Sequence, residues 1–214
     1  MPRPDGRSVD TRKRLLDAAL EEFAREGFRR ATIERICRRA KANIAAVHYH
    51  FGDKGRLYAA VVEHADERAE AERPRERTAA SSPEERLRSH VTAFLRRLLD
   101  PKRPTWMAQL LAHELLEPTP ALDRLVRRRI RANHDQIAGI IRELAPHLSR
   151  EAARLATLSV IAQCVFYRHS AAIVSRLYPD LHPAQEIDRL ADHVTRFSLA
   201  AIGSLEKPRE DVAS

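Results

Sequence analysis

Apolar residues along most of this chain recur at spacings of three and four, and no stretch has the sustained alternation that is typical of a half-buried strand. The clearest stripe predicts a helix that begins near Ser8 or Asp10, either of which can serve as its N-cap, and that ends at Gly27. The apolar face of this helix consists of Leu16, Ala19, Leu20 and Phe23. The same spacing in later segments predicts an all-α fold.

Two short helices separated by a tight turn are predicted next. Thr32 can cap the first of them through its hydroxyl, and this helix ends near Ala40. The second ends at Phe51-Gly52, after which Asp53 is placed to cap a longer helix. The pattern indicates a helix-turn-helix within an N-terminal three-helix domain.

The distribution of proline divides the chain into two regions. No proline occurs from Asp5 to Arg73, whereas prolines separate the apolar stripes of the remainder. The first domain is therefore expected over residues 8–72 and a C-terminal helical domain over residues 80–206. Ser82-Pro83-Glu84-Glu85 is a strong start signal for the second domain, because Ser82 and Glu85 can form a capping box. Further helices are predicted at about 105–117, 120–145, 150–178 and 184–205.

The excess of positive charge lies near the N-terminus. The 214 residues include 38 Lys and Arg against 30 Asp and Glu, which gives a formal charge of +8. Residues 1–56 carry +6 of this charge, and the remaining 158 residues carry +2. A basic N-terminal segment favours a polyanionic partner such as nucleic acid.

The cysteines and the apolar stretches indicate a reducing compartment. Cys37 and Cys164 lie far apart, with no further ligand at metal-binding spacing, so neither a disulfide framework nor a zinc site is expected. The N-terminus has no apolar signal segment, and the longest fairly apolar stretch, 155–167, is shorter than the roughly 20 residues that cross a bilayer. We therefore expect a cytoplasmic protein without a membrane partner.

An enzymatic function has little support in the sequence. His113-Glu114 resembles the start of a metalloprotease helix, but that motif needs a second histidine at i+4, where this chain has Glu117. The ten histidines are scattered, and there is no glycine-rich phosphate loop. The sequence predicts a protein that is not an enzyme and that holds no cofactor or metal.

The two short helices match the geometry by which a second helix enters the DNA major groove while the first crosses the backbone. Helix pairs are common, and the alternative is that Arg35, Arg38 and Arg39 form only a solvated face.

The residues from Thr32 to Leu57, TIERICRRAKANIAAVHYHFGDKGRL, resemble the N-terminal domain of the TetR family of bacterial transcriptional regulators. The core of the resemblance is Tyr49-His50-Phe51 with Lys54 and Leu57, approached through Phe23, Gly27 and Thr32. It covers residues of about 10–60, and the helical remainder has the length expected of the family's second domain.

The turn departs from the common family pattern. Many members have Gly-Val-Ser where this chain has Lys41-Ala42-Asn43, and Lys-Gly-Thr where it has Ile44-Ala45-Ala46. The base preference is therefore open. The run Asn43-Ile-Ala-Ala resembles a branch of the family whose members control drug-efflux or transport genes.

Candidate DNA contacts begin at the two helix starts. Thr32 can bind a phosphate through its hydroxyl and the helix N-terminus, or act as a plain N-cap, and the two roles are compatible. Asn43 can cap the second short helix or pair with an adenine edge. Ala45 and Ala46 are small enough to meet a thymine methyl, and Lys41 can contact a phosphate.

Three further candidates follow along the second short helix. His48 can reach a base or a phosphate, because Val47 must face the core and His48 then points away. Tyr49 and Lys54 resemble the phosphate-binding pair of the family, and the alternative for both is surface packing.

The most apolar helices are those at 150–178 and 184–205, and their apolar faces must be buried against another element. A short reading helix spans few base pairs, so two half-sites about 34–36 Å apart and a twofold dimer are expected. Resemblance to the family places the homodimer interface on these last two helices, as a four-helix bundle. The alternative is that they only close the core of a monomer.

A pocket for a small-molecule effector is a further expectation, although apolar residues at helical spacing can equally belong to the core. The candidate lining residues are Trp106, Met107, Leu111, His134, Gln163, Phe166 and Tyr167. In TetR-like proteins such an effector changes the separation of the two DNA-reading heads.

The sequence thus predicts a homodimeric TetR-like regulator. It is expected to act as a repressor that binds a palindromic double-stranded DNA operator and that a small apolar or amphipathic effector of unknown identity releases. The alternative is a constitutive architectural DNA-binding protein with a filled C-terminal core and no ligand.

Overall fold

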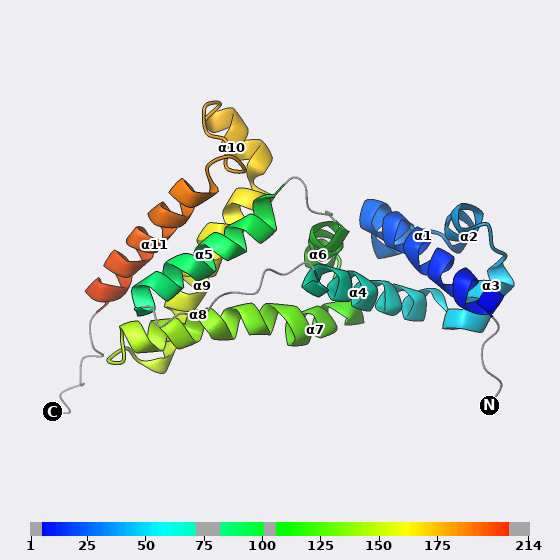
Figure 1. The fold of residues 1–214 in the computed structure, drawn as a ribbon, viewed down its shortest axis with the longest axis horizontal. Helices are drawn as coiled ribbons and strands as arrows, with labels where there is room; N and C mark the ends of the chain where they lie inside the picture. Colours follow the sequence, from blue (N-terminus) through cyan, green and yellow to red (C-terminus); the bar gives the residue numbers. More distant parts are fainter. Residues whose placement is uncertain (1–5, 72–81, 101–105, 206–214) are drawn as a thin grey trace. The chain divides into compact units, whose positions relative to one another are not determined.

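The computed structural model describes residues 6–71, 82–100 and 106–205, and these residues form helices and connecting turns with no strand. Figure 1 follows the helices in chain order. The predicted all-α fold is confirmed. The chain divides into two compact units, of which unit 1 contains residues 1–75 and 104–129 and unit 2 contains residues 76–103 and 130–214.

Unit 1 is built around the first helix. Its described elements are α1 (Gly6–Arg30), α2 (Ile33–Ala40), α3 (Ile44–Phe51), α4 (Lys54–Ala71), α6 (Trp106–Leu116) and α7 (Pro120–Leu125). Helix α7 continues into a π-helical turn, η1 (Val126–Ile130), whose last residue belongs to unit 2. Helix α1 packs against α2, α3, α4 and α6. The core has Phe23 and Leu57 fully buried at its centre, and the ring of Tyr58 meets Phe23 edge-on at 4.9 Å.

A glycine ends the regular part of the first helix, as predicted. Gly27 has a φ of 75°, in the left-handed region that glycine adopts without a Cβ penalty. A Cβ at this position would lie 2.8 Å from Nδ1 of His113 on α6. The imidazole of His113 also lies with Nε2 3.1 Å from the carbonyl oxygen of Ala24. The kink therefore admits a close contact between α1 and α6.

A buried carboxyl group joins α4, α6 and the loop before α7. Glu114 is 1% exposed, and its Oε1 accepts hydrogen bonds from the hydroxyls of Tyr58 at 2.7 Å and Thr119 at 2.7 Å. Its Oε2 accepts a third from the Thr119 backbone N–H at 2.8 Å. Burial, together with the bond to Glu114, raises the pKa of Tyr58 and keeps its phenol protonated as a donor.

Unit 2 contains α5 (Pro83–Leu99), α8 (Arg131–Leu144), α9 (Arg150–His169), α10 (Ala171–Leu177) and α11 (Ile187–Ser204). The predicted capping box is present, because Ser82 Oγ accepts from Glu85 N at 3.2 Å and Glu85 Oε2 accepts from Ser82 N at 3.1 Å. Helix α5 packs against α8, α9 and α11. Their shared core includes Leu87, Val91, Leu95, Ile137, Ile141, Val160, Cys164 and Val194.

The compact units do not coincide with the expected domains at 8–72 and 80–206. Residues 104–129 belong to unit 1, because Leu110 of α6 is fully buried in its core and Trp106, Met107 and Leu111 pack against that core. A contact between segments so far apart in sequence leaves no local signal in the chain.

Three of the predicted helices also differ in detail. The segment 120–145 consists of α7, η1 and α8, and the segment 150–178 breaks into α9 and α10 at Ser170. The last helix begins at Ile187 rather than near 184. Neither the π-helical turn nor the break contains proline or glycine, so no residue of the usual punctuating types marks them.

Both cysteines are buried. Cys37 is 4% exposed and Cys164 is fully buried. Burial, with a smaller contribution from Glu34, raises the pKa of the Cys37 thiol. Burial raises the pKa of Cys164 to about 12, against a smaller opposing effect of Arg97. A redox sensor needs an exposed thiol of lowered pKa, and neither cysteine has these properties.

The thiols are therefore expected to react slowly in the folded protein. At pH 8 we expect an aromatic disulfide reagent to modify both cysteines roughly a hundredfold more slowly in the native protein than in denaturant, because burial suppresses the thiolate and blocks access. The measurement is the absorbance of the released thiolate, and Cys37→Ser and Cys164→Ser assign the two phases. A native thiol that reacts at the denatured rate would contradict the burial of that cysteine.

No described helix is both long enough and apolar enough to cross a bilayer.

Candidate DNA-binding interface

The turn between α2 and α3 is held by local hydrogen bonds. Thr32 caps α2, because its side chain accepts from Arg35 N at 3.3 Å. Lys41 ends α2 in the left-handed conformation with a φ of 50°, and the Ala42 N–H donates to the Cys37 carbonyl at 3.0 Å. A left-handed residue at this position closes the helix and turns the chain at once. The side chain of Lys41 is exposed.

Helix α3 has an inner and an outer face. Val47 is 1% exposed and Phe51 is 8% exposed, and both belong to the core of unit 1. Ala46 is half-buried and packs against the same core. The outer face consists of Ile44, Ala45, His48 and Tyr49, all of which are exposed. Tyr49 stands out, because 81% of its surface is exposed.

Side chains fix both ends of α3. Asn43 caps the helix, because its Oδ1 accepts from the Ala46 N–H at 2.8 Å. At the other end, Nδ1 of His48 lies 2.7 Å from the carbonyl oxygen of Gly52. Gly52 has a φ of 85°, so it supplies the left-handed turn that starts α4, and Asp53 caps α4 through Arg56 N at 2.8 Å. The helix is therefore presented as a rigid element.

Lys54 is engaged inside the unit. Its Nζ donates to the carbonyl oxygen of Arg29 at 3.2 Å and lies 4.9 Å from the centre of the Phe28 ring. Burial lowers the pKa of Lys54, and the charge of Glu34 opposes this effect. The ammonium group stabilises the carbonyl end of α1. It has three donors, so this bond leaves others for a phosphate.

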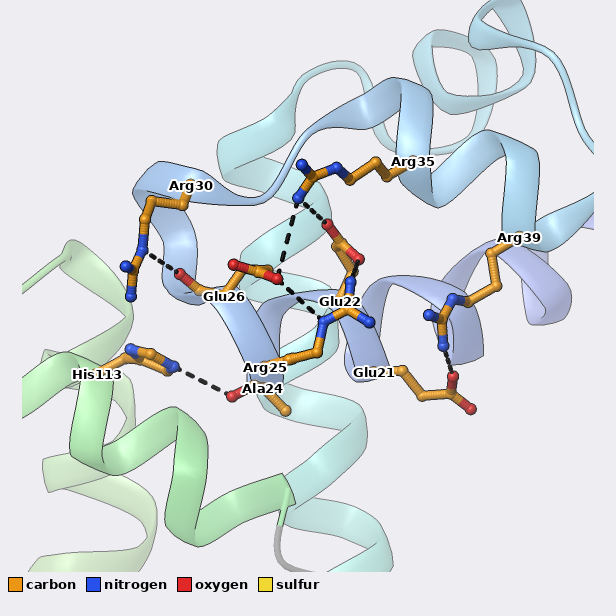
Figure 2. Close-up of polar contacts among 9 residues, drawn as sticks. All are labelled: Glu21, Glu22, Ala24, Arg25, Glu26, Arg30, Arg35, Arg39 and His113. Atoms are coloured by element: carbon orange, nitrogen blue, oxygen red, sulfur yellow. Dashed lines mark hydrogen bonds and ion pairs between the residues drawn. The ribbon is translucent and has the colours of Figure 1, made fainter.

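Carboxylates of α1 pair with two of the three arginines of α2, Arg35 and Arg39, as Figure 2 shows. Glu22 is 1% exposed and pairs with Arg25 at 2.9 Å and with Arg35 at 3.5 Å. Arg39 pairs with Glu21 of α1. Arg35 and Arg39 are exposed, and their guanidinium groups are paired with carboxylates of α1. The sequence pattern alone did not reveal these pairs.

Two family descriptions match this chain. Residues 15–61 match the family described as "Bacterial regulatory proteins, tetR family", and residues 83–202 match the "HTH-type transcriptional dual regulator CecR, C-terminal domain". The second match alone covers more than half of the chain. This protein belongs to the TetR family. The predicted resemblance is confirmed, and the C-terminal match adds that its second part is of the CecR type.

Curated relatives are similar over part of this chain. The HTH-type transcriptional repressor SCO4008 of Streptomyces coelicolor is 43% identical over 53 residues, which are 25% of this chain and 28% of the relative. The HTH-type transcriptional repressor NicS of Pseudomonas putida is 36% identical over 85 residues, which are 40% of each chain. The matched segments thus span well under half of these relatives.

Solved structures share the fold over most of the chain. SCO4454, a TetR-family transcriptional regulator from Streptomyces coelicolor, has a TM-score of 0.65 at 18% identity and covers 91% of both chains. The transcriptional regulator RHA1_ro04179 from Rhodococcus sp. Rha1 has a TM-score of 0.60 at 19% identity, covering 89% of this chain and 96% of that one. At such identities the likeness establishes the TetR-family fold alone.

The predicted effector residues of this TetR-family chain fall on both units. Trp106, Met107 and Leu111 belong to unit 1, where Arg68 lies over the Trp106 ring at 4.6 Å. His134, Gln163, Phe166 and Tyr167 belong to unit 2. In unit 2, Gln163 donates to Ser198 Oγ at 3.2 Å, and Phe166 is 52% exposed. The first three residues pack against the core of unit 1, whereas Tyr167 packs against the core of unit 2.

A polar cluster inside unit 2 was missed by the sequence analysis. His90 is 3% exposed, and its Nε2 lies 3.0 Å from Oδ1 of Asn133, which also accepts from Arg97 Nη2 at 3.0 Å. Arg97 lies over the Phe94 ring at 5.4 Å. A histidine within an apolar stripe is predicted to be a core residue, so no local sequence pattern distinguishes this polar cluster from ordinary core positions.

Helices α9 and α11 carry an exposed apolar face. Leu155 and Leu158 of α9 are 58% and 55% exposed, and Phe197 of α11 is 60% exposed. Ala162 and Ala201 are also exposed on these helices. In contrast, Leu190, Val194 and Ile202 lie in the core of unit 2. The apolar residues of α11 are therefore divided between the core and an outer surface.

Within the described part of the chain, no group of three or more His, Cys, Asp and Glu residues is placed to hold a metal ion.

Proposed function

We propose that this protein is a transcriptional repressor that binds a palindromic operator as a homodimer in the cytoplasm and that a small molecule releases. The outer face of α3 carries this proposal. A rigid eight-residue helix, capped at both ends, presents an exposed row of side chains above a buried Val47 and Phe51. This is the form in which a helix enters the major groove of B-DNA.

Phosphate contacts come from the edges of this helix-turn-helix. Thr32, Lys41 and Tyr49 present a hydroxyl, an ammonium group and a phenol at exposed or half-buried positions. Lys54 adds its remaining donors. Such contacts fix the register of the protein on the duplex without reading its sequence.

Base contacts come from the N-cap of α3 and from the outer face of the helix. Asn43 and His48 supply polar groups, and Ala45 offers a methyl that can meet a thymine methyl. Ala46 is half-buried and packs against the core of unit 1, so it is not one of the proposed base contacts.

The homodimer forms through the exposed apolar face of α9 and α11. Apolar side chains of this size are rarely left in contiguous exposed patches on a monomer. A twofold interface would cover them in both copies and would set two α3 helices at half-site spacing.

The effector binds in unit 2, where the polar cluster of His90, Arg97 and Asn133 lies among apolar side chains. Apolar surroundings with a few convergent polar groups suit a small amphipathic molecule. Release from DNA requires that the effector bind one conformation of the dimer more tightly than the other.

The test is selection of bound duplexes from a random library. A palindromic consensus is expected, with half-sites about one helical turn apart. The consensus duplex then serves as the probe for effectors that release it. No enrichment over bulk DNA at physiological salt would overturn the proposal of a sequence-specific repressor.

A phosphate contact by Lys41 can be recognised from the salt dependence of DNA binding. Lys41→Gln is expected to weaken binding to the operator and to random DNA equally, and to reduce the slope of log K against log salt concentration by about 0.9, because one counterion fewer is released. Glutamine keeps a non-glycine residue at the left-handed position. The measurement is fluorescence anisotropy over a salt series.

Arg142→Gln is the matched control, because Arg142 is an exposed cation of α8 in unit 2 and should leave the slope unchanged. A Lys41→Gln effect on one sequence only would contradict the phosphate assignment.

A further inference from the structure

The hydrogen bond at the end of α3 determines which nitrogen of His48 carries its proton. Nδ1 of His48 lies 2.7 Å from the carbonyl oxygen of Gly52. A carbonyl oxygen can only accept, so Nδ1 must be the donor. In a neutral imidazole the other nitrogen, Nε2, then has a lone pair and no hydrogen.

His48 is exposed on the outer face of α3, and Nε2 has no hydrogen-bond partner among the described residues. The other polar side chain at the start of this face has the opposite character. Oδ1 of Asn43 already accepts from the Ala46 N–H at 2.8 Å, and the two hydrogens of its amide NH₂ are donors for a new partner. The face thus offers a donor at Asn43 and an acceptor at His48.

We propose that neutral His48 accepts a hydrogen bond from the exocyclic amine of adenine N6 or cytosine N4. These amines are the only base-edge donors in the major groove, whereas guanine O6 and N7, thymine O4 and the phosphates are acceptors that an Nε2 lone pair repels. This assignment removes the phosphate as a partner for His48. It rests on the proposed DNA-binding function and adds the functional group that His48 reads.

The first experiment compares consensus sequences selected at about pH 8, where an ordinary imidazole is neutral. The wild-type protein should select A or C at one position of each half-site. His48→Ala should lose the preference at that position alone. His48→Lys, which can only donate, should change it to G.

The second experiment removes the amine instead of the histidine. In the consensus duplex, purine in place of the selected adenine, or 2-pyrimidinone in place of the selected cytosine, should weaken wild-type binding roughly three- to tenfold per half-site. The same base change should have no effect on His48→Ala. Such non-additivity assigns the contact to this pair of groups.

A direct measurement of the tautomer completes the test. Long-range ¹H–¹⁵N correlation spectra of the free protein should show the hydrogen of His48 on Nδ1.

His147→Ala is the matched control for the selection experiment, because His147 is an exposed histidine of unit 2 whose Nε2 lies 3.3 Å from the Leu205 carbonyl oxygen. It should return the wild-type consensus.

The outcomes separate this inference from the proposed function. A wild-type consensus that His48→Ala retains, a G at the position that His48→Ala loses, or a hydrogen on Nε2 would overturn the His48 assignment and leave a sequence-specific regulator. A wild-type protein that enriches no sequence would overturn the proposed function, and the His48 assignment with it.

Discussion

Replacing Glu114 by alanine is expected to lower the free energy of unfolding by about 3–5 kcal/mol. The carboxyl group is 1% exposed and accepts three hydrogen bonds from Tyr58 and Thr119. Its removal leaves the buried Tyr58 hydroxyl and the Thr119 N–H without their acceptor and opens a cavity between α4 and α6. The measurement is urea unfolding followed by circular dichroism.

Two further variants make this result specific. Glu114→Gln should cost only about 1 kcal/mol, because the amide oxygen can accept from the Thr119 N–H while the hydroxyls rotate to accept from the NH₂ group. Glu117→Ala removes a neighbouring carboxylate that is 53% exposed and pairs with Arg29 at 3.4 Å. That change should stay within about 0.5 kcal/mol of wild type. Equal costs for alanine and glutamine at position 114 would contradict the proposed role of the three hydrogen bonds.

Interactions between residues close in sequence were predictable. Thr32, Asn43 and Ser82 cap the helices that their positions indicate, and Gly27 and Gly52 have the positive φ values expected at helix ends. The caps depend on a side chain and a backbone N–H three residues apart, and the positive φ values depend on the glycine itself. A single sequence contains both partners of each such interaction.

Interactions between distant residues were not predictable. His113-Glu114 resembles the start of a metalloprotease helix in the sequence, whereas in the structure these residues contact α1 and α4 and join α6 to the rest of unit 1. The ion pairs of Glu22 with Arg35 and of Glu21 with Arg39 likewise join two helices. Helical periodicity identifies an apolar or charged face but carries no information about which element it will meet.

The apolar residues of α9 and α11 illustrate the same limit. Leu158 and Val160 are separated by one residue and are equally apolar, yet Leu158 is 55% exposed and Val160 is 1% exposed. A helix that is apolar on two sides has one face for its own core and another for a different partner. The packing of α5 against α9 determines which side of α9 faces the core and which side is exposed.

Leu158 lies on the exposed side of α9, which is the proposed dimer interface. Leu158→Glu is expected to raise the dissociation constant of the homodimer by roughly a thousandfold or more, because the twofold interface would contain the substitution twice and each copy would bury a charge in place of an apolar side chain. Operator affinity should fall with it, since a monomer can occupy only one half-site. The measurements are sedimentation equilibrium and fluorescence anisotropy on the selected duplex.

Leu116→Glu is the matched control for this variant. Leu116 is a leucine of α6 with 81% of its surface exposed, and it belongs to unit 1 rather than to the apolar face of α9 and α11. The same change in size and charge at this position should leave both the dimer and operator binding intact. If Leu158→Glu also sediments as a wild-type dimer, the interface lies elsewhere, and the exposed face of α9 and α11 must have a different partner. If Leu158→Glu is a folded monomer with undiminished operator affinity, two half-sites are not needed for binding, and the palindromic operator is wrong.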